Sequence, residues 1–341
     1  MASNELYSPA LLSVDCELCA TRMQAVTDLL LLTSDLRPVN SESLSVFGES
    51  YSKCREIIIA RSMGLTVFTR DIMNQLRSNR LKDVSDTLKD LTDVVIRIVE
   101  CSSHAAYLAA ITELGSVPAL PGIIDKYKVT RAKVDIELAS NRFHLTPLSE
   151  LSPQVLVNIS EELIKNLETL THACKLASDA SEDQFHKEQF RLSLKNVTAC
   201  TSSLLSCIRR YKSTLDEQSR ARCISFSKPL VQSCISLVDY ATEAEHIGLP
   251  AELPDSSRRI QTAILGGCMS IASSCVRLCE SVQMALYDIK NPESMKRLSV
   301  CCTAILDGSQ LLSQALRDKA SVRTLSSTPS SSPRSQSTET L

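Results

Sequence analysis

Aromatic residues, glycine and net charge are all scarce in this sequence. Its 341 residues include no Trp and only 4% aromatics, and Gly occurs 8 times, well below its usual share of about 7%. Large β-sheets and barrels depend on aromatic and β-branched residues and on glycine-rich turns, so these folds are not expected. The 37 basic and 39 acidic residues give a net charge of −2, which excludes the broad positive field of a dedicated nucleic-acid or membrane-surface binder.

The sequence also lacks the patterns of targeting and membrane-spanning segments. Its first residues, 1–7, do not combine a basic stretch with a long apolar one. No uninterrupted apolar run approaches the roughly 18 residues that cross a bilayer. We therefore expect a cytoplasmic protein with no membrane insertion and no nucleic-acid partner.

Cysteine, in contrast, is frequent, at 14 residues. The CxxC formed by Cys16 and Cys19 continues at helical steps of three and four into Met23, Val26 and Leu30, which is typical of a buried helix face. We interpret the cysteines as reduced core residues of a long chain without a secretory signal.

Catalytic and metal-binding motifs are not apparent in the sequence. A zinc site needs a second CxxC or a His pair at ligand spacing. Helical di-metal sites need two Glu-x-x-His motifs, and Glu243-x-x-His246 is the single copy. The sequence also lacks a phosphate-binding glycine loop and a GxSxG turn. We expect no enzymatic activity, no metal and no cofactor.

Apolar residues recur at steps of three and four along almost the whole chain, which predicts an all-α protein. Ser8, Ser152 and Asp255 are expected helix caps, and Ser181 with Gln184 an expected capping box. The pattern predicts nine helices, at about 9–36, 49–78, 81–113, 121–145, from Pro153, from Ser181 to Lys212, 217–246, from Asp255, and from Pro292 to Lys319. Pro229 is expected to start or kink the main segment of the seventh helix.

Two breaks rich in Pro and Gly, at 115–122 and 248–254, divide the predicted helices. They enclose four helices with a self-contained apolar pattern. We expect an all-α fold in which this four-helix bundle is inserted between the third and fourth helices of a five-helix bundle. The predicted boundaries are 1–119 and 251–319 for the five-helix bundle, 120–250 for the insert, and 320–341 for a disordered Ser-rich tail.

Five segments of the sequence resemble the talin rod, namely residues 29–39, 101–110, 226–231, 262–270 and 311–317. The helix order is similar to the talin-rod double module, in which a four-helix bundle is inserted into a five-helix bundle. The resemblance implies binding to the sides of actin filaments through basic helix faces. It also implies binding of amphipathic partner helices in a groove of the insert, and a homodimer that cross-links filaments.

Two basic stretches are the candidate actin-binding surface under this resemblance. Residues at four-residue spacing share one helix face, as Lys187, Arg191 and Lys195 do. The alternative is a solvated surface that binds nothing. The full candidate set is Lys187, Arg191, Lys195, Arg209 and Arg210 together with Lys126, Lys128, Arg131 and Lys133.

The helix predicted at 217–246 is apolar on more than one side, whereas one broad apolar face is enough for a four-helix bundle. We interpret one of its apolar stripes as a homodimer interface; the alternative is that both stripes pack within the bundle. The interface residues are Cys223, Phe226, Leu230, Cys234 and Leu237. The leading hypothesis is a homodimer that binds and bundles actin filaments. The alternative is a cytosolic adhesion scaffold that binds amphipathic helices of partner proteins without contacting actin.

Overall fold

The computed structural model describes residues 7–32, 45–287 and 291–326, and these residues are predominantly α-helical, which confirms the all-α prediction. Two short strands, β1 (Leu120–Pro121) and β2 (Gly248–Leu249), and three short helical turns complete the described elements. The α-helices are α1 (Pro9–Thr27), α2 (Tyr51–Arg77), α3 (Leu81–Ile111), α4 (Lys126–Leu145), α5 (Pro153–Ala180), α6 (Gln184–Thr214), α7 (Glu217–Ala241), α8 (Ala244–Ile247), α9 (Asp255–Ala285) and α10 (Pro292–Ser326).

Side-chain caps begin several helices where the sequence predicts them. Ser8 Oγ accepts a hydrogen bond from the backbone N–H of Leu11 at 3.1 Å, ahead of Pro9 in the first turn of α1. Ser152 Oγ accepts one from Val155 at 3.3 Å at the start of α5. Each cap satisfies a backbone N–H that has no partner within its own helix.

Two predicted caps are wrong. Ser181 ends α5, and Asp183 caps α6 by accepting a hydrogen bond from the Phe185 N–H at 2.8 Å. An ionised carboxylate accepts such a bond more strongly than a hydroxyl does, which explains the later start. Asp255 is the first helical residue of α9, after Pro254. There its carboxylate interacts with the positive end of the helix dipole rather than capping the helix.

Two helices extend beyond the points where the sequence predicts an interruption. α7 begins at Glu217 and continues through Pro229, so this proline does not start the segment. α10 reaches Ser326, past the predicted end near Lys319. No proline precedes Pro329 in this part of the sequence, so the backbone can remain helical. The rest of the predicted tail, 327–341, lies outside the described residues.

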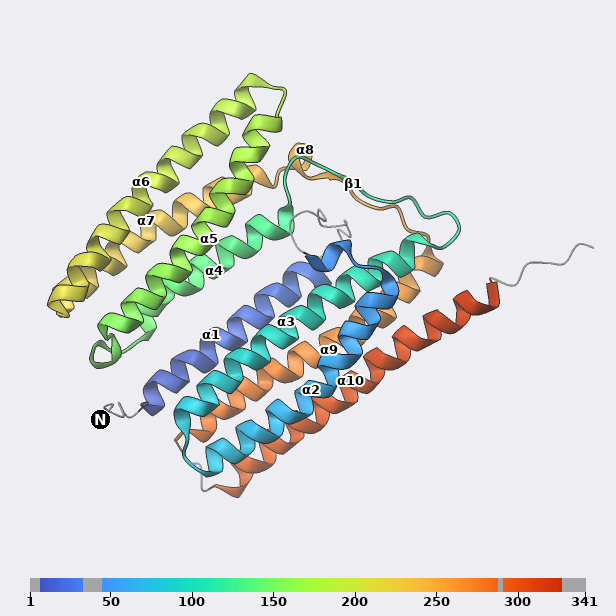
Figure 1. Cartoon of the computed structure of the whole chain (residues 1–341), viewed down its shortest axis with the longest axis horizontal. Helices are drawn as coiled ribbons and strands as arrows, with labels where there is room; N and C mark the ends of the chain where they lie inside the picture. The colour runs from blue at the N-terminus through green and yellow to red at the C-terminus, as the bar shows by residue number, and fades with distance from the viewer. Residues whose placement is uncertain (1–6, 33–44, 288–290, 327–341) are drawn as a thin grey trace, which may run out of the picture.

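The helices gather around two separate apolar cores (Figure 1). We call α1, α2, α3, α9 and α10 the first helix group, and α4 to α7 the second helix group. In the second group, each helix contacts two neighbours, in the order α4, α5, α6, α7 and back to α4. In the first group, α9 contacts α1, α3 and α10. Contacts between α1 and α4 place the two groups side by side.

The two linkers between the helix groups run antiparallel. Leu120 pairs with Leu249 in the β1–β2 ladder, and Val117 exchanges two backbone hydrogen bonds with Glu252, at 2.9 and 3.0 Å.

The two linkers cross most closely at two glycines, because neither has a side chain. A Cβ added to Gly122 would lie 2.1 Å from the carbonyl oxygen of His246, and one added to Gly248 would lie 2.1 Å from that of Leu120. Gly248 also has a φ of +77°, which other residues adopt only with strain.

α3 and α9 are long and apolar enough to meet the length and composition of a membrane span, each with a mean hydropathy of 1.4 over its most apolar window. However, 72% of that window in α3 and 56% in α9 is buried in the structure. Both helices contribute buried residues to the first core, the apolar core of the first helix group. The core helices of soluble proteins pass the same test, so this is weak evidence for a membrane span.

α9 and α10 approach each other closely at two glycines. A Cβ on Gly267 would lie 2.7 Å from the Cα of Leu312, and one on Gly308 would lie 3.0 Å from the backbone nitrogen of Ile271. Gly266, the preceding residue, has no atom within 4 Å of its Cβ position.

We predict opposite effects of alanine at the two neighbouring glycines. Gly267→Ala should lower the free energy of unfolding by about 1–3 kcal/mol, because backbone atoms of α10 occupy the space of the new methyl group. Gly266→Ala is the matched control and should raise it by up to about 1 kcal/mol, the gain in helix propensity. Urea unfolding measures both values, and equal effects would contradict the close approach.

Candidate functional site

The exposed face of α6 carries the larger of the two predicted basic stretches. Lys187, Arg191 and Lys195 follow one another at four-residue steps, and Arg209 is five full helical turns after Arg191. Lys187 is half-buried and the other three are exposed. We call these four residues the α6 basic stripe. Arg210 is also exposed, about 100° around the helix from Arg209.

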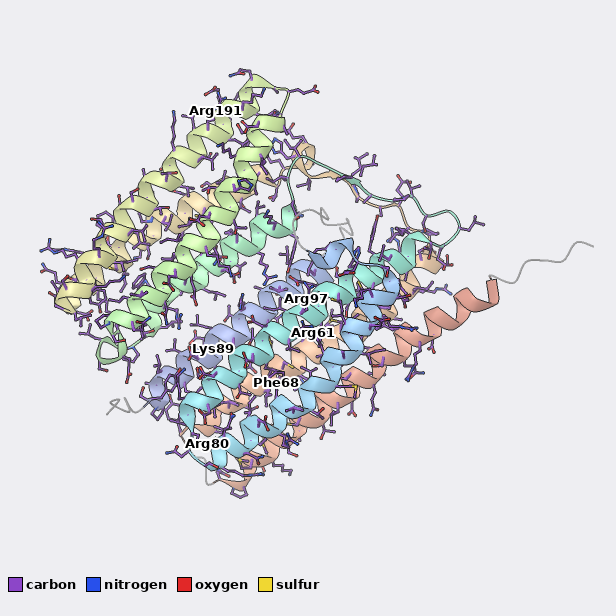
Figure 2. All side chains as sticks on the ribbon, in the orientation of Figure 1. Arg61, Phe68, Arg80, Lys89, Arg97 and Arg191 are labelled. Carbon is purple, nitrogen blue, oxygen red and sulfur yellow. The ribbon has the colours of Figure 1, made fainter. Side chains whose placement is uncertain are left out.

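The α6 basic stripe has little acidic charge near it on its own helix. Glu188 is the single acidic residue of α6, and it pairs with Arg191 at 2.8 Å. Thr198 and Ser202, between the basic residues, donate to backbone carbonyls of α6 at 2.8 and 3.0 Å. The stripe extends about 33 Å from Lys187 to Arg209, at 1.5 Å per residue. Figure 2 shows Arg191 on α6, at the side of the second group away from α1.

The second predicted basic stretch has different surroundings, because it lies on α4, the helix that contacts α1. Lys126, Lys128 and Lys133 are half-buried. Arg131 forms an ion pair with Glu100 of α3, and its side chain is 22% exposed. Its guanidinium compensates the charge of a buried carboxylate, and its place in an actin-binding surface stays a prediction.

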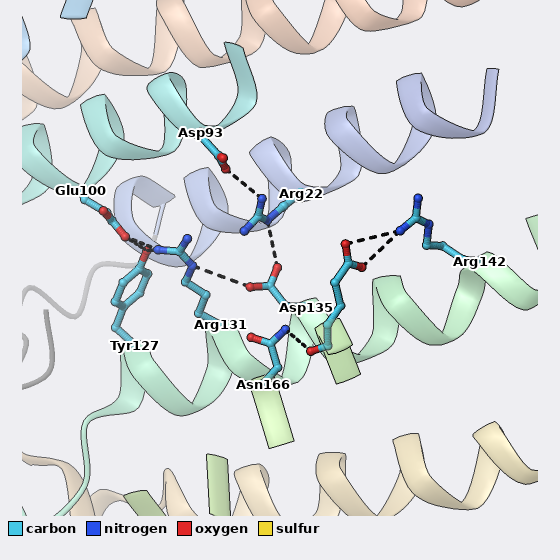
Figure 3. Close-up of polar contacts among 9 residues, drawn as sticks. Arg22, Asp93, Glu100, Tyr127, Arg131, Asp135, Arg142 and Asn166 are labelled. Atoms are coloured by element: carbon cyan, nitrogen blue, oxygen red, sulfur yellow. Dashed lines mark hydrogen bonds and ion pairs between the residues drawn. The ribbon is translucent and has the colours of Figure 1, made fainter. Parts of the chain in front are cut away.

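Charged side chains join the two helix groups around a cavity of about 490 Å³ (Figure 3). Arg22 of α1 bridges Asp93 of α3 and Asp135 of α4, with both nitrogen–oxygen distances 3.0 Å. Arg142 of α4 lies 3.3 Å from Glu162 of α5. Acidic and basic groups alternate around this cavity, so their charges compensate one another and hold α1, α3 and α4 together.

Asp15 is the most buried acidic residue at this junction. Its carboxylate accepts hydrogen bonds from Ser85 Oγ at 2.6 Å and Lys89 Nζ at 2.9 Å, and it lies 3.7 Å from Arg142 Nη2. Tyr7 also donates its hydroxyl hydrogen to this carboxylate. Burial acts to raise the pKa of Asp15, but Lys89 and the hydrogen bonds outweigh it, so the pKa lies below its usual value.

α7 places most of the predicted dimer interface inside the protein. Cys223, Leu230, Cys234 and Leu237 are wholly buried in the second core. Assigning these four to a dimer surface is therefore wrong, because their stripe is the internal face of α7. Phe226 is the exception, with 41% of its surface exposed.

The cysteines are core residues in the structure. All 14 lie among the described residues, none forms a disulfide, and Cys200, Cys207 and Cys302 are the only ones not fully buried. Burial raises the pKa of Cys223 and of Cys234 to about 12. Such thiols remain protonated at neutral pH, which is typical of core cysteines rather than of nucleophiles.

One group of side chains was not predicted from the sequence. His186 of α6 comes together with Glu245 and His246 of α8, and their possible metal-ligand atoms all lie within 4.8 Å of one another. Glu243, the other residue of the Glu-x-x-His motif, is not part of this group. Helical spacing could not reveal it, because His186 is far from α8 in the sequence.

We predict that Asp15→Asn lowers the free energy of unfolding by about 2 kcal/mol at pH 7, because Lys89 loses a charged partner. The lowered pKa means that the carboxylate stabilises the fold above pH 4 to 5 and that this contribution is lost as the pH falls further. The difference between wild type and variant should therefore shrink in acid. Urea unfolding across pH measures this. Asp93→Asn, at the exposed partner of Arg22, is the control and should cost under about 1 kcal/mol.

Comparison with known proteins connects this structure to talins. A sequence model of the talin IBS2B domain matches residues 124–244, which cover α4 to the start of α8. The chain is 27% identical to talin of Oscarella pearsei over 308 residues and 22% identical to talin-1 of Gallus gallus over 306 residues, in each case 90% of its own length. It is 23% identical to talin-2 of Homo sapiens over 80% of its length.

The chain spans 12% of the length of the first two relatives and 10% of that of human talin-2. The matched region thus corresponds to a small part of each talin and to most of this chain. Together with the helical architecture, these matches show that the chain is similar to a part of talins over most of its length, with residues 124–244 similar to the talin IBS2B domain.

Proposed function

We propose that this protein binds and bundles actin filaments as a homodimer in the cytoplasm. The observation that carries the proposal is the α6 basic stripe, a row of basic side chains about 33 Å long on a helix with a single acidic residue. The resemblance to the talin rod supplies the partner, an acidic filament. Charge complementarity of this kind favours association with such a surface.

The domain division that underlies this proposal is a four-helix bundle inserted into a five-helix bundle. The two separate cores support it, since each is formed mainly by one helix group. The paired linkers support it as well, because the chain leaves the first group after α3 and returns to it before α9. The α6 basic stripe then belongs to the inserted bundle, on the side opposite the junction with α1.

Bundling requires two filament-binding surfaces in one particle, and a two-fold dimer is the commonest way to obtain them. We place the dimer contact at Phe226, which remains exposed on α7 while the rest of its predicted stripe is buried. The partly exposed thiols of Cys200 and Cys207 on the neighbouring α6 add polarizable surface to the same side of the second group.

The proposed dimer contact lies along the seam between α6 and α7. The α6 basic stripe lies on the opposite side of α6 from this seam. Ser233, two turns after Phe226 on α7, accepts a hydrogen bond from Asn196 Nδ2 at 3.0 Å and lies 3.5 Å from Cys200 Sγ. These two α6 residues are rotated by about 140–180° from Arg191 around the helix axis. A dimer formed along this seam would therefore leave both copies of the stripe open to filaments.

We predict that reversing the charge of Lys187, Arg191 and Lys195 to Glu weakens filament binding about 10- to 100-fold without loss of helicity. Three ionic contacts at the protein surface, of about 0.5–1 kcal/mol each, account for this range. Binding by the wild type should also fade with salt, since the screening length falls from about 10 Å at 0.1 M to about 3 Å at 1 M. Co-sedimentation with filaments measures both effects.

The matched control for this variant reverses Arg61, Arg70 and Arg77, which are exposed on α2 in the first helix group. Its net charge changes equally, so a specific site on α6 predicts near-normal binding. Equal losses in both variants would indicate non-specific attraction. Unchanged binding of the α6 variant would move the site to the first group. Absence of pelleting by the wild type at low salt would favour the scaffold that binds partner helices without actin.

We predict that Phe226→Asp is monomeric, retains its helical signal, still binds filaments and no longer bundles them. Two copies of the new carboxylate would face each other in the dimer contact and lose water, at a cost of several kcal/mol. Light scattering measures the mass, and low-speed sedimentation of filaments measures bundling.

Leu176→Asp is the control for Phe226→Asp, because Leu176 is also a half-exposed apolar residue of the second group but lies on α5. It should remain dimeric. A dimeric Phe226→Asp would remove α7 from the interface. A folded monomer that bundles normally would show that bundling does not depend on dimerisation.

A further inference from the structure

We propose that His186, Glu245 and His246 form a zinc site that fastens the start of α6 to α8. The site lies where the second helix group meets the outgoing linker (Figure 1). Two imidazoles and one carboxylate are a ligand set that Zn²⁺ accepts in proteins, with water in the fourth position.

The ligand atoms are already close to coordination spacing. Glu245 Oε1 lies 3.7 Å from His186 Nε2 and 3.9 Å from His246 Nε2. Zinc–ligand bonds of about 2.0–2.2 Å in tetrahedral geometry place neighbouring ligands about 3.3–3.5 Å apart. Small side-chain movements therefore bring these atoms to a shared ion. Asp183 Oδ2, 3.7 Å from His186 Nε2, is a further carboxylate oxygen beside the site.

Tyr240 orients both imidazoles so that their Nε2 atoms are available. Its backbone carbonyl lies 3.0 Å from His246 Nδ1 and accepts the hydrogen of that nitrogen, which leaves Nε2 with an unshared electron pair. The Tyr240 hydroxyl lies 2.7 Å from His186 Nδ1 and can act in the same way on the second ring. Histidine ligands of metals are commonly held by such a bond from the other ring nitrogen.

His246 provides an independent indication of a ligand. The residue is 2% exposed, and its Nε2 is buried without a hydrogen-bond partner. A buried polar atom without a partner costs free energy, and a coordinated ion would remove that cost. Aromatic packing prevents the ring from turning away, since Phe190 and Tyr240 lie 5.3 and 5.1 Å from it between ring centroids.

The surroundings favour a cation and allow it to enter. Carboxylate oxygens of Asp183 and Glu245 each lie 3.7 Å from His186 Nε2, so negative charge is concentrated here. The side chain of Glu245 is 55% exposed. Movement of this one side chain opens the group of ligands to solvent.

A bound ion would act on the connection between the helix groups. The carbonyl of His246 accepts a hydrogen bond from the N–H of Ile124 at 3.1 Å, which joins α8 to the incoming linker. The same carbonyl lies against Gly122 at the linker crossing. Zinc would therefore fasten α6, α8 and both linkers at one point, and we infer that it stabilises the second helix group against unfolding from this end.

The test is titration of the full chain with zinc, by calorimetry and thermal unfolding. We expect one strong site per chain and a melting temperature raised by about 5–10 °C when free zinc is about 100 times its Kd. Glu245→Gln and His186→Ala should each weaken binding at least about 100-fold, since each removes a ligand. Tyr240→Phe should weaken it about 10- to 100-fold through loss of orientation.

His172→Ala is the matched control, because His172 is exposed on α5 outside this group, and it should bind zinc like the wild type. Cobalt as a second probe separates this site from the thiols, since thiolate ligands add a sulfur-to-cobalt charge-transfer band that a histidine and carboxylate site lacks. Absence of strong binding, binding with that band, or unchanged affinity in folded Glu245→Gln and His186→Ala would each overturn the proposal. Glu245 is exposed, so its substitution leaves the core intact.

Discussion

The antiparallel crossing of the two linkers at Gly122 and Gly248 constrains the rest of the structure. Neither position has room for a side chain, because backbone atoms of the opposite linker occupy the place of a Cβ. Since both linkers pass through this point, α4 begins and α7 ends at the same end of the second helix group. The direction in which α4 leaves the crossing places it along α1, and the charged junction between the groups follows from that placement.

The two helix groups meet largely through charged and polar side chains. Glu100 of α3 is buried there, and it is compensated by Arg131 and by the Tyr127 hydroxyl at 2.8 Å. Tyr127 is the single α4 residue that belongs to the first core. Breaking such a buried pair leaves an uncompensated charge, which costs more than the pair contributes when intact. The junction therefore specifies one relative arrangement of the groups more than it adds stability.

The sequence could predict those features that depend on neighbouring positions in the chain. The step of three and four along Cys16, Cys19 and Met23 places these residues in the first core, as the structure confirms. Ser8 and Ser152 cap helices because a cap requires only the next three residues. The α6 basic stripe was likewise visible as a four-residue spacing, because its helix face needs no partner to be defined.

Features that depend on distant contacts could not be predicted in this way. The ion pair of Arg131 has no signal in the sequence, because its partner Glu100 lies on another helix. α7 is apolar on more than one side, so the sequence does not indicate whether the stripe of Cys223 and Leu230 faces the core or the surface. His186 comes close to Glu245 and His246 only in the folded protein, where α8 packs beside the start of α6. In each case the missing information was the packing of one helix against another.

The pairing of Val117 with Glu252 has a consequence for how such a chain can change in evolution. Two mutual hydrogen bonds in an antiparallel pair set the Cα atoms about 5.5 Å apart. A gap of this size can be closed by a turn of two residues. The whole segment between these positions could therefore be excised or exchanged for another while α3 and α9 keep their places. The positions of α3 and α9 would then not depend on the length of the chain between them.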